Sequence, residues 1–496
     1  MEGYLIRLVA IILSISILFT LLAGCTPDGA ENQDNVPPDL PDELLGITED
    51  TVWVGNTIDI TGEYAAVGSR FKLGIEAAFA AYNASGGYNG KSIKLKHYDD
   101  GGIALQSVSL MEKLIFEDEV FAIVGNFGSY AVDVNLEIIK DEAIPMIYAA
   151  ADNNALLNEN ATSAGDKAVF PVRPLNLTEG RMLLLRAFAP AADANGNPLG
   201  GFGATKVGVI SNSSEASKTL LSGIKAEAEN LSAAQKDNIV YREVSDSDYS
   251  AAVNAFKAAG CDVVIITVIG ADFLTALTAM ADAKYYCKAL TSCNNASADM
   301  FNESNVLAPS YKSIFSTVAL YAQAWLDISS TTYVYNEDTP LNAEYRAFIE
   351  AYGLPYTGVA GFNEAYWAAA ENIYTYALTV NPATALANSY DSYALTGYIA
   401  GDLFCQAMEA LEKSGKALSR ANLVAVMESW EFRVAMADKI SFANGMRTGV
   451  QSFALTSIYD VFHLDTAVGG GVYHRAESVT VHGFTSIEDY RALIAK

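Results

Sequence analysis

Residues 86–92 read GGYNGKS and come close to a motif with known chemistry, the phosphate-binding loop. The required G-x-x-x-x-G-K-[ST] spacing fails by one residue, because position 85 is serine. The segment also follows an expected helix and precedes an expected strand, whereas a phosphate-binding loop leaves a strand and opens a helix. We therefore reject a nucleotide site here.

The four histidines of the chain offer little support for acid–base or metal chemistry. His97 lies in a strand-like segment, and the others are scattered near the C-terminus: His463, His474 and His482. Adjacent acids such as Asp99 and Asp100 more often face solvent in an acidic chain than perform catalysis. No zinc-protease, nucleophile-elbow or dinucleotide-binding motif occurs in the required context. The sequence therefore predicts no catalytic residue, no metal site, no cofactor and no enzyme activity.

A large excess of acidic residues excludes a further class of function. The 496 residues include 58 Asp and Glu against 31 Lys and Arg, a formal charge of −27. Such a chain lacks the excess positive charge that displaces counterions from phosphates, so no nucleic-acid partner is expected. Hydrophobic residues make up 51% of the chain, enough for large cores. Its length suggests about two to four domains.

The N-terminus has the pattern of an export signal. Residues 8–23 form an uncharged apolar run, shorter than the about 20 residues that a membrane-spanning helix needs. Residues 22–25, LAGC, resemble the bacterial lipobox, which implies that Cys25 becomes lipidated after cleavage. An uncleaved anchor helix is the alternative. We expect residues 1–25 to be a lipoprotein signal peptide, with Cys25 attaching the mature chain to a membrane.

Residues 26–50 are expected to form a disordered acidic tether. They contain eight acids, four prolines and no Lys or Arg. Such a composition cannot bury enough apolar surface to fold, and its like charges repel one another.

The remaining four cysteines do not indicate a particular function. Cys287 and Cys293 are a conceivable disulfide pair in an exported protein. Cys261 and Cys405 fit small core positions better. No C-x-x-C motif supports a zinc or redox site.

Beyond residue 50, strand-like and helix-like segments alternate. Apolar β-branched runs predict strands, and apolar residues at helical spacing predict helices. Regular alternation is typical of βαβ units, in which a parallel sheet carries helices on both faces. The expected strands of the first block are residues 52–60, 93–98, 120–124 and 144–148, and its expected helices are residues 69–83, 104–116 and 131–140.

The alternation restarts after a connecting stretch at residues 170–201. The second block has expected strands at residues 206–211, 239–244 and 262–268, and expected helices at residues 215–229, 249–259 and 273–283. The rest is less regular, with a strand at 314–320, helices at 343–352, 365–378, 392–414 and 419–428, and strand-like runs at 452–457 and 458–464. We expect an α/β chain with an N-terminal lobe at 51–175, a C-terminal lobe at 176–310, and crossover segments at 311–496 that complete both.

Several segments, in order along the chain, resemble one protein family. Residues 58–68, IDITGEYAAVG, match its first strand and loop, and residues 83–91, NASGGYNGK, match a helix end that explains the imitated phosphate-binding loop. Further matches are Tyr98-Asp99-Asp100, residues 248–251 followed by 260–264, and residues 392–421. The chain resembles the type I periplasmic binding proteins of the leucine/isoleucine/valine-binding kind, the solute receptors of branched-chain amino-acid-type ABC transporters.

The resemblance implies a particular architecture. Two Rossmann-like lobes, each a parallel sheet flanked by helices, are joined by a multi-strand hinge. The ligand cleft lies between them, at the carboxyl ends of the strands, where open α/β sheets generally bind ligands. Hinge closure around the solute then buries it.

Two residues are expected to bind the polar groups of the solute. Ser129 begins a helix, where free backbone N–H groups suit a carboxylate, and it falls where the family places a carboxylate-binding serine. A plain helix cap is the alternative. Asp272 follows the strand at 262–268, where amino-acid binders of this family keep an acid for the ligand ammonium. A solvent-facing cap is again the alternative.

Further contacts are expected around these two. Tyr64, in the first strand-to-helix loop, and Tyr321, after the strand at 314–320, could wall an apolar pocket, although most of the 27 tyrosines serve packing. Phe127 and Ala150, at the ends of neighbouring strands, complete the predicted set.

Departures from the family pattern bear on the solute. Residues 149–152 read AAAD, so Asp152 stands where many relatives have a carboxylate-binding threonine. Residues 212–215, NSSE, replace the family's Tyr-Gly turn. Asp152 would repel a ligand carboxylate unless it accepts a hydrogen bond from an amine or hydroxyl. The two acids, Asp152 and Asp272, favour a solute with more positive charge or more hydroxyls than an ordinary branched-chain amino acid.

The resemblance implies a lipid-anchored receptor on the extracytoplasmic face of a bacterial membrane. It would bind an amino acid or amine-bearing small solute and pass it to ABC permease subunits. One alternative is a ligand-sensing lipoprotein that serves a membrane signalling partner. A surface enzyme on the same scaffold is a further alternative, which the absence of catalytic motifs disfavours.

Overall fold

The computed structural model describes residues 45–152, 154–304, 306–327, 329–335, 339–351, 359–362, 364–464 and 472–495. The chain divides into an N-terminal unit, Met1–Pro41, and a compact unit, Asp42–Lys496, to which the following description applies. The predicted signal peptide and Cys25 lie outside the described residues. Within those residues, no helix combines the length and the apolar character needed to cross a membrane.

The first sheet forms from the N-terminal block in the order β2-β1-β3-β4-β5, and all its strand pairs are parallel. Strand β1, TVWVGNTI, is buried along almost its whole length, as expected for a parallel strand covered on both faces. The strands are β1 (Thr51–Ile58), β2 (Ser92–Asp99), β3 (Ala122–Val124), β4 (Met146–Ile147) and β5 (Val169–Phe170).

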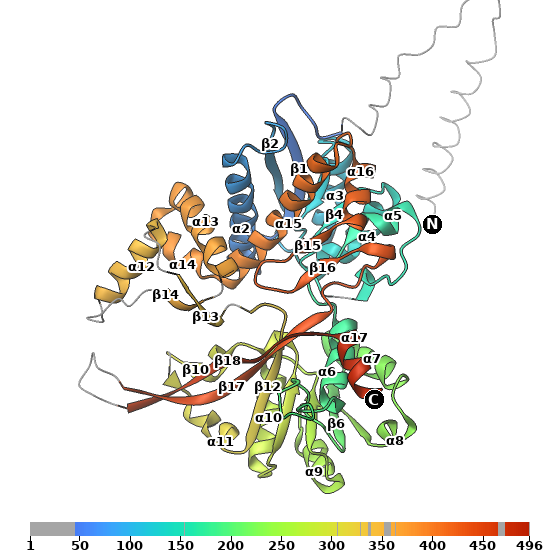
Figure 1. Ribbon diagram of the computed structural model, residues 1–496, viewed down its shortest axis with the longest axis vertical. Coiled ribbons are helices and arrows are strands. Elements are labelled where there is room, and N and C mark those ends of the chain that lie inside the picture. The colour runs from blue at the N-terminus through green and yellow to red at the C-terminus, as the bar shows by residue number, and fades with distance from the viewer. Residues whose placement is uncertain are drawn as a thin grey trace, which may run out of the picture. The chain divides into compact units, whose positions relative to one another are not determined.

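Helices from both ends of the chain cover this sheet. Figure 1 shows α2 (Ala65–Ala84) and α15 (Ser392–Ser414) side by side. Gly74 and Gly397 allow this approach, because a Cβ on either would lie about 2 Å from a backbone oxygen of the other helix. The other helices of this part are α3 (Ala104–Phe116), α4 (Ser129–Asp141), α5 (Ala164–Ala168), α12 (Pro340–Ala351), α13 (Glu364–Val380), α14 (Ala385–Ser389) and α16 (Arg420–Ser429).

The second sheet has the order β18-β17-β12-β9-β8-β6-β7. Its centre is parallel, whereas β17 pairs antiparallel with both β12 and β18. The strands are β6 (Val207–Asn212), β7 (Ile239–Val244), β8 (Val263–Ile266), β9 (Cys287–Thr291), β12 (Val318–Ala324), β17 (Ser452–Leu464) and β18 (Val472–Ser486). The helices of this part are α6 (Asn176–Phe188), α7 (Glu215–Ala228), α8 (Ala233–Lys236), α9 (Ser250–Ala259), α10 (Ala271–Asp282), α11 (Lys312–Phe315) and α17 (Ile487–Ile494).

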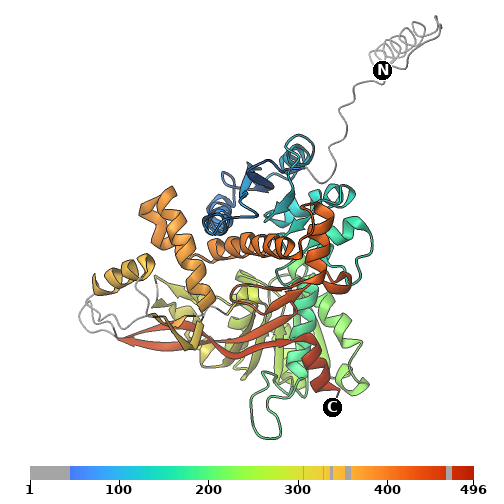
Figure 2. The same cartoon turned by 45° about the horizontal axis from the view of Figure 1, so that its top comes forward.

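Several late elements differ from the sequence expectation. The strand-like runs at 452–457 and 458–464 are one continuous strand, β17, whose partner β18 was not predicted. Figure 2 shows the pair as a long ribbon near the C-terminus, with α17 following it. Strands β5 and β9 were also not predicted, and neither were these hairpins: β10 (Asn302–Glu303) with β11 (Val306–Leu307), β13 (Ser329–Tyr335) with β14 (Val359–Phe362), and β15 (Glu431–Arg433) with β16 (Lys439–Ser441).

In the described part of the chain, the backbone passes between the two sheets at three places, and hydrogen bonds join two of these crossovers. Val450 N donates to Val172 O over 3.0 Å, so the crossover before α6 pairs with the one before β17. Thr178 Oγ1 donates to Thr448 O over 3.0 Å. The third crossover follows β12, where Asp327 N donates to Met436 O, in the turn between β15 and β16, over 2.7 Å. The first two crossovers, residues 171–178 and 448–451, therefore form a hydrogen-bonded hinge segment.

Three further expectations need correction. Residues 45–50, assigned to the disordered tether, pack against β1: Trp53 N donates to Gly46 O over 2.7 Å. Residues 314–320 were expected to be a strand, but α11 ends at Phe315 and β12 begins at Val318. The segment that resembles a phosphate-binding loop is the turn between α2 and β2. It follows a helix and precedes a strand, as the sequence predicted.

The conceivable disulfide is absent, because Cys287 and Cys293 are free cysteines, as are Cys261 and Cys405. Cys287 begins β9, whereas Cys293 follows the end of that strand. The strand alone separates its ends by about 13 Å. A disulfide requires Cα atoms within about 7 Å of each other.

Candidate functional site

The carboxyl ends of β3 and β4 continue into loops that remain paired. Ala150 N donates to Asn126 O over 2.7 Å, and Gly128 N donates to Ala150 O over 3.2 Å. This pairing brings Phe127 and Ala150, both predicted contacts, next to each other. The ring of Phe127 packs 5.3 Å from that of Phe71, so one side of Phe127 belongs to the core.

Ser129 is the first residue of α4 and is exposed. The capping residue is Gly128, whose φ of 91° favours glycine, and no side chain caps this helix. The expected alternative role of Ser129 as the cap is therefore wrong. Its hydroxyl and the free N–H groups of the first turn could receive an anion.

Tyr64 lies beside Tyr130, their rings stacked at 6.3 Å with 14° between planes. Tyr130 donates its hydroxyl to Asp100 Oδ1 over 2.7 Å. Burial and this carboxylate raise the pKa of Tyr130. Tyr64 is 45% exposed, so its ring offers a partly open aromatic surface at this end of the sheet.

Asp152 joins the ends of the two sheets. Its Oδ2 accepts a hydrogen bond of 3.3 Å from Asn294 Nδ2. Asp152 lies in the segment after β4, and Asn294 lies in the short 3-10 helix after β9, Cys293–Asn295. The carboxyl ends of strands from both sheets therefore meet at this pair.

Two residues that the sequence analysis missed lie in the same group. Tyr148 directly follows β4, is fully buried, and has no hydrogen-bond partner for its hydroxyl. Burial raises the pKa of Tyr148 to about 12, an effect that nearby Arg173 partly offsets. Arg173 lies in the crossover before α6. Its guanidinium interacts electrostatically with Tyr148, Asp152, Cys293 and Tyr393, of which Asp152 is the one carboxylate.

Glu179 forms a buried polar contact behind this group. Its Oε2 accepts from Ser292 Oγ over 2.8 Å, and its Oε1 accepts from Cys293 N over 2.6 Å. Burial raises the pKa of Glu179 to about 7, although these hydrogen bonds oppose the shift. Glu179 therefore fastens α6 to the end of β9.

Asp272 lies in the first turn of α10, after β8. Its Oδ2 accepts from Asn212 Nδ2 over 2.9 Å, so it bridges the ends of β8 and β6. Burial and the charge of Asp272 raise the pKa of Tyr249 to about 12. Among the described residues, no contact joins Asp272 directly to Asp152, and its role in ligand binding stays a prediction.

Tyr321 lies inside β12 instead of after it, because the strand begins and ends later than expected. Its ring packs 4.9 Å from that of Phe202, and Tyr321 is partly buried against the core of the second sheet. The structure gives no contact between Tyr321 and the other predicted site residues that it describes. The placement that made Tyr321 a pocket wall is thus wrong.

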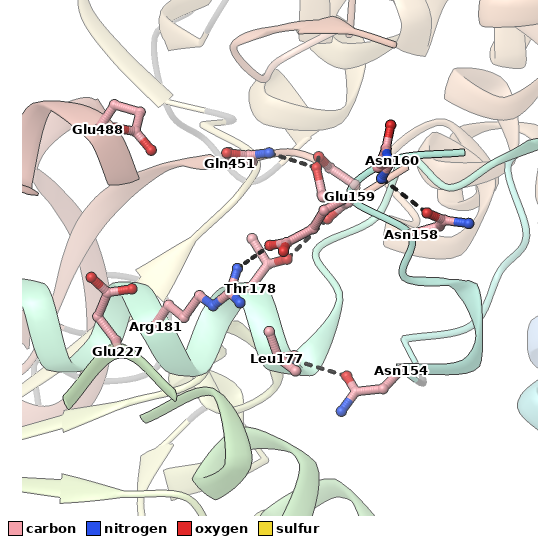
Figure 3. A network of polar contacts seen from close by, with 12 residues as sticks. Asn154, Asn158, Glu159, Asn160, Leu177, Thr178, Arg181, Glu227, Gln451 and Glu488 are labelled. Atoms are coloured by element: carbon pink, nitrogen blue, oxygen red, sulfur yellow. Dashed lines mark hydrogen bonds and ion pairs between the residues drawn. The ribbon is translucent and has the colours of Figure 1, made fainter. Parts of the chain in front are cut away.

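Further contacts fix α6 and the hinge segment (Figure 3). Leu177 N donates to Asn154 Oδ1 over 3.0 Å, and Arg181 forms an ion pair with Glu159. Gln451 Nε2 donates to Thr448 Oγ1 over 2.6 Å. The first two bonds connect the segment after β4 with the start of α6, and the third lies within the hinge segment.

A separate cavity of about 510 Å³ lies between α6, α7, α8 and α17. Leu231, Gln235 and Arg491 line it. Arg491 donates from Nη2 to the buried Glu227 over 2.6 Å, so this charge pair is satisfied internally. In the part of the chain that the structure describes, no cluster of three His, Cys, Asp or Glu residues could hold a metal ion.

Comparison with known proteins gives a family match across most of the chain. Residues 51–460 match the family described as periplasmic binding protein. A Leu/Ile/Val-binding protein homolog 2 of Brucella abortus is 34% identical over 21% of this chain and 27% of that protein. An amino acid binding protein of Pseudomonas aeruginosa is 26% identical over 41% of this chain and 50% of that protein. The chain spans about a quarter to a half of the length of these curated relatives.

Solved structures share the fold. A fatty acid ABC transporter substrate-binding protein from Thermomonospora curvata has a TM-score of 0.54 at 16% identity, covering 90% of this chain and 95% of its own. A putative branched-chain amino acid ABC transporter from Rhodospirillum rubrum has a TM-score of 0.54 at 15% identity, covering 82% and 98%. Identities this low support the fold alone. They confirm the predicted α/β class, with parallel sheets flanked by helices in two lobes.

Proposed function

We propose that this chain, which belongs to the periplasmic binding protein family, is the extracytoplasmic solute receptor of a branched-chain amino-acid-type ABC importer. It binds an amino acid or amine-bearing small solute between the ends of the two sheets, and closure about the hinge segment buries the solute. It then passes the solute to permease subunits. Lipidation of Cys25 holds the receptor at the membrane.

The observation that carries this proposal is the contact between Asp152 and Asn294. It places polar groups from the carboxyl ends of both sheets within 3.3 Å of each other. Ligands of open α/β sheets bind at such strand ends. A solute that replaced this single weak hydrogen bond with bonds to both sheets would favour the closed arrangement over the open one.

The solute chemistry follows from the charges at the strand ends. Asp152 and Asp272 are carboxylates that an ammonium group can bind by charge-assisted hydrogen bonds. Tyr64, Phe127 and Ser129 complete the proposed contacts from the first sheet, with Ala150 beside them. The relatives' names, which include amino acid and Leu/Ile/Val binding, support an amino acid or a related amine.

A thermal-shift screen tests the proposal. The purified full-length protein is mixed with amino acids, polyamines, small amides, nucleosides and sugars. A solute at 100 times its dissociation constant stabilises the folded protein by about 2.7 kcal/mol, which raises the melting temperature measurably. We expect a shift with an amine-bearing solute.

Two variants on the same helix test whether Asp272 contacts the solute. Asp272→Ala should lose the shift, whereas Asp282→Ala, at the exposed far end of the same helix, should retain it. A solute that stabilises both variants as well as the unchanged protein contradicts the role of Asp272. If no solute class stabilises the protein, the receptor function itself is contradicted.

A further inference from the structure

Arg173 is a cation at the proposed solute site whose charged group lacks a partner. Among the described residues, its guanidinium makes no hydrogen bond or ion pair, and its Nε is buried without a partner. The residue as a whole is only partly buried. A half-buried guanidinium is ordinarily paired, because an unpaired charge is costly to remove from water.

The position of Arg173 is set by the hinge segment. Its carbonyl oxygen lies so close to Gly449 that a Cβ there would approach within 2.1 Å. Pro171 and Pro174 flank it in the sequence and restrict the backbone on both sides. The crossover runs beside the segment that contains Tyr148 and Asp152, since Tyr148 N donates to Phe170 O over 3.1 Å and Asn176 N donates to Asp152 O over 3.0 Å. The side chain therefore starts from a rigid crossover next to these residues, within electrostatic range of both.

Tyr148 supplies a second unsatisfied group at the same place. Its φ of 58° is a left-handed conformation that a bulky aromatic residue rarely adopts. Its ring packs 5.9 Å from that of Phe71, and its buried hydroxyl lies near Thr396 without a hydrogen bond of ordinary length. Strained backbone and unsatisfied polar groups tend to persist at ligand sites, where a bound molecule completes them.

We propose that Arg173, instead of Ser129, receives the anionic group of the solute, so that the proposed receptor takes carboxylate-bearing solutes. This inference rests on the proposed function. The guanidinium offers a planar pair of N–H donors that matches a carboxylate, whereas the exposed Ser129 offers only one hydroxyl and the end of a helix. Asp152, beside Arg173, then selects carboxylates that also carry a positive charge.

The groups around Arg173 are consistent with this assignment. They are the phenols of Tyr148 and Tyr393, the thiol of Cys293 and the carboxylate of Asp152. The carboxyl group of Glu179 lies behind them, because Cys293 N donates to its Oε1 over 2.6 Å. A zwitterion adds no net charge to this group, with its carboxylate on Arg173 and its ammonium on Asp152.

The test compares solutes that differ only in the charged group. Isothermal titration of the full-length protein uses L-leucine, L-leucinamide and 3-methylbutylamine as one set. Octanoate and octanol form a second set, because one solved neighbour is titled a fatty acid binder. We expect a carboxylate to bind at least tenfold more tightly than its uncharged or purely cationic counterpart. Leucine binding supports both parts of the assignment. Octanoate binding without leucine binding would support a carboxylate on Arg173 and would contradict the pairing of Asp152 with a positive charge.

Variants of two arginines then test whether Arg173 binds the carboxylate. R173Q should weaken carboxylate binding at least tenfold, R173K should retain part of it, and R242Q, at an exposed site in β7, should retain all of it. If R173Q folds poorly, the partial loss of binding expected for R173K still tests the assignment.

Carboxylate binding that is equal in R173Q and the unchanged protein would overturn the assignment. Tight binding of the amine or the amide without the carboxylate would also overturn it, while leaving the receptor function intact. If none of these probes binds and the broader solute screen is also negative, both proposals fail together.

Discussion

Glu179 should make the stability of the fold fall as the pH rises toward neutrality. Its carboxyl group is buried between α6 and the end of β9, and burial raises its pKa from 4.5 to about 7. Between these two values the folded protein holds a proton that the unfolded chain has released. Unfolding then releases that proton, so the free energy of unfolding decreases with rising pH.

The magnitude follows from the size of the pKa change. A difference of about 2.5 in pKa corresponds to about 3 kcal/mol. This contribution is present in full below pH 4.5 and is lost by about pH 7. Burial also raises the pKa of Asp402 to about 6, which changes the unfolding free energy in the same direction. The pH dependence of the unchanged protein alone therefore does not separate the contribution of Glu179 from that of Asp402.

The assay is urea unfolding at pH 4 and pH 8, comparing the unchanged protein with Glu179→Gln. The variant cannot titrate at this position, and any loss of hydrogen bonding is largely the same at both pH values. The difference in unfolding free energy between the two proteins should change by about 3 kcal/mol between pH 4 and pH 8. Glu303→Gln, at an exposed position, should show no such change. A difference that is constant with pH would refute the reasoning, because Glu179 would then titrate normally in the folded protein.

Three other perturbations have defined outcomes. Arg491→Ala should lower the unfolding free energy by about 2–3 kcal/mol in urea, because it leaves the buried Glu227 carboxylate unpaired; a loss below 0.5 kcal/mol would contradict that. Asp152→Asn should weaken binding of an amine-bearing solute about tenfold or more by titration calorimetry, and unchanged affinity would remove Asp152 from the site. Thiol titration in denaturant without reductant should find Cys287 and Cys293 both reactive, whereas loss of two thiols would indicate a disulfide.

The alternating elements could be predicted because their patterns are local. Helix α15 was predicted with its observed bounds, since Asp391 caps its start and Gly415 ends it in a left-handed conformation. Most of the buried strands were likewise predicted from apolar runs, whereas β5 and β9 were not predicted. Strand β18 was missed because its residues were considered without β17, the partner that fixes their register.

The site was less predictable because it depends on contacts between distant segments. Ser129 and Asp272 lie in the first turns of helices that follow strands, and their positions at helix starts were predicted correctly. Arg173 carries a local signal, an arginine between prolines after a strand, but nothing nearby indicates that its side chain reaches Asp152. The backbone conformation of Tyr148 has no sequence signature at all. Tyr321 was misplaced by a shift of a few residues in one strand boundary, which moved it from a strand end into the middle of the strand.

The most direct test of the receptor account is hydrogen exchange with and without a stabilising solute. If the solute binds between the ends of the two sheets, the segment after β4 and the segment after β9 should both gain protection, together with the hinge segment. Protection confined to one sheet, or to the cavity between α7 and α17, would contradict the account.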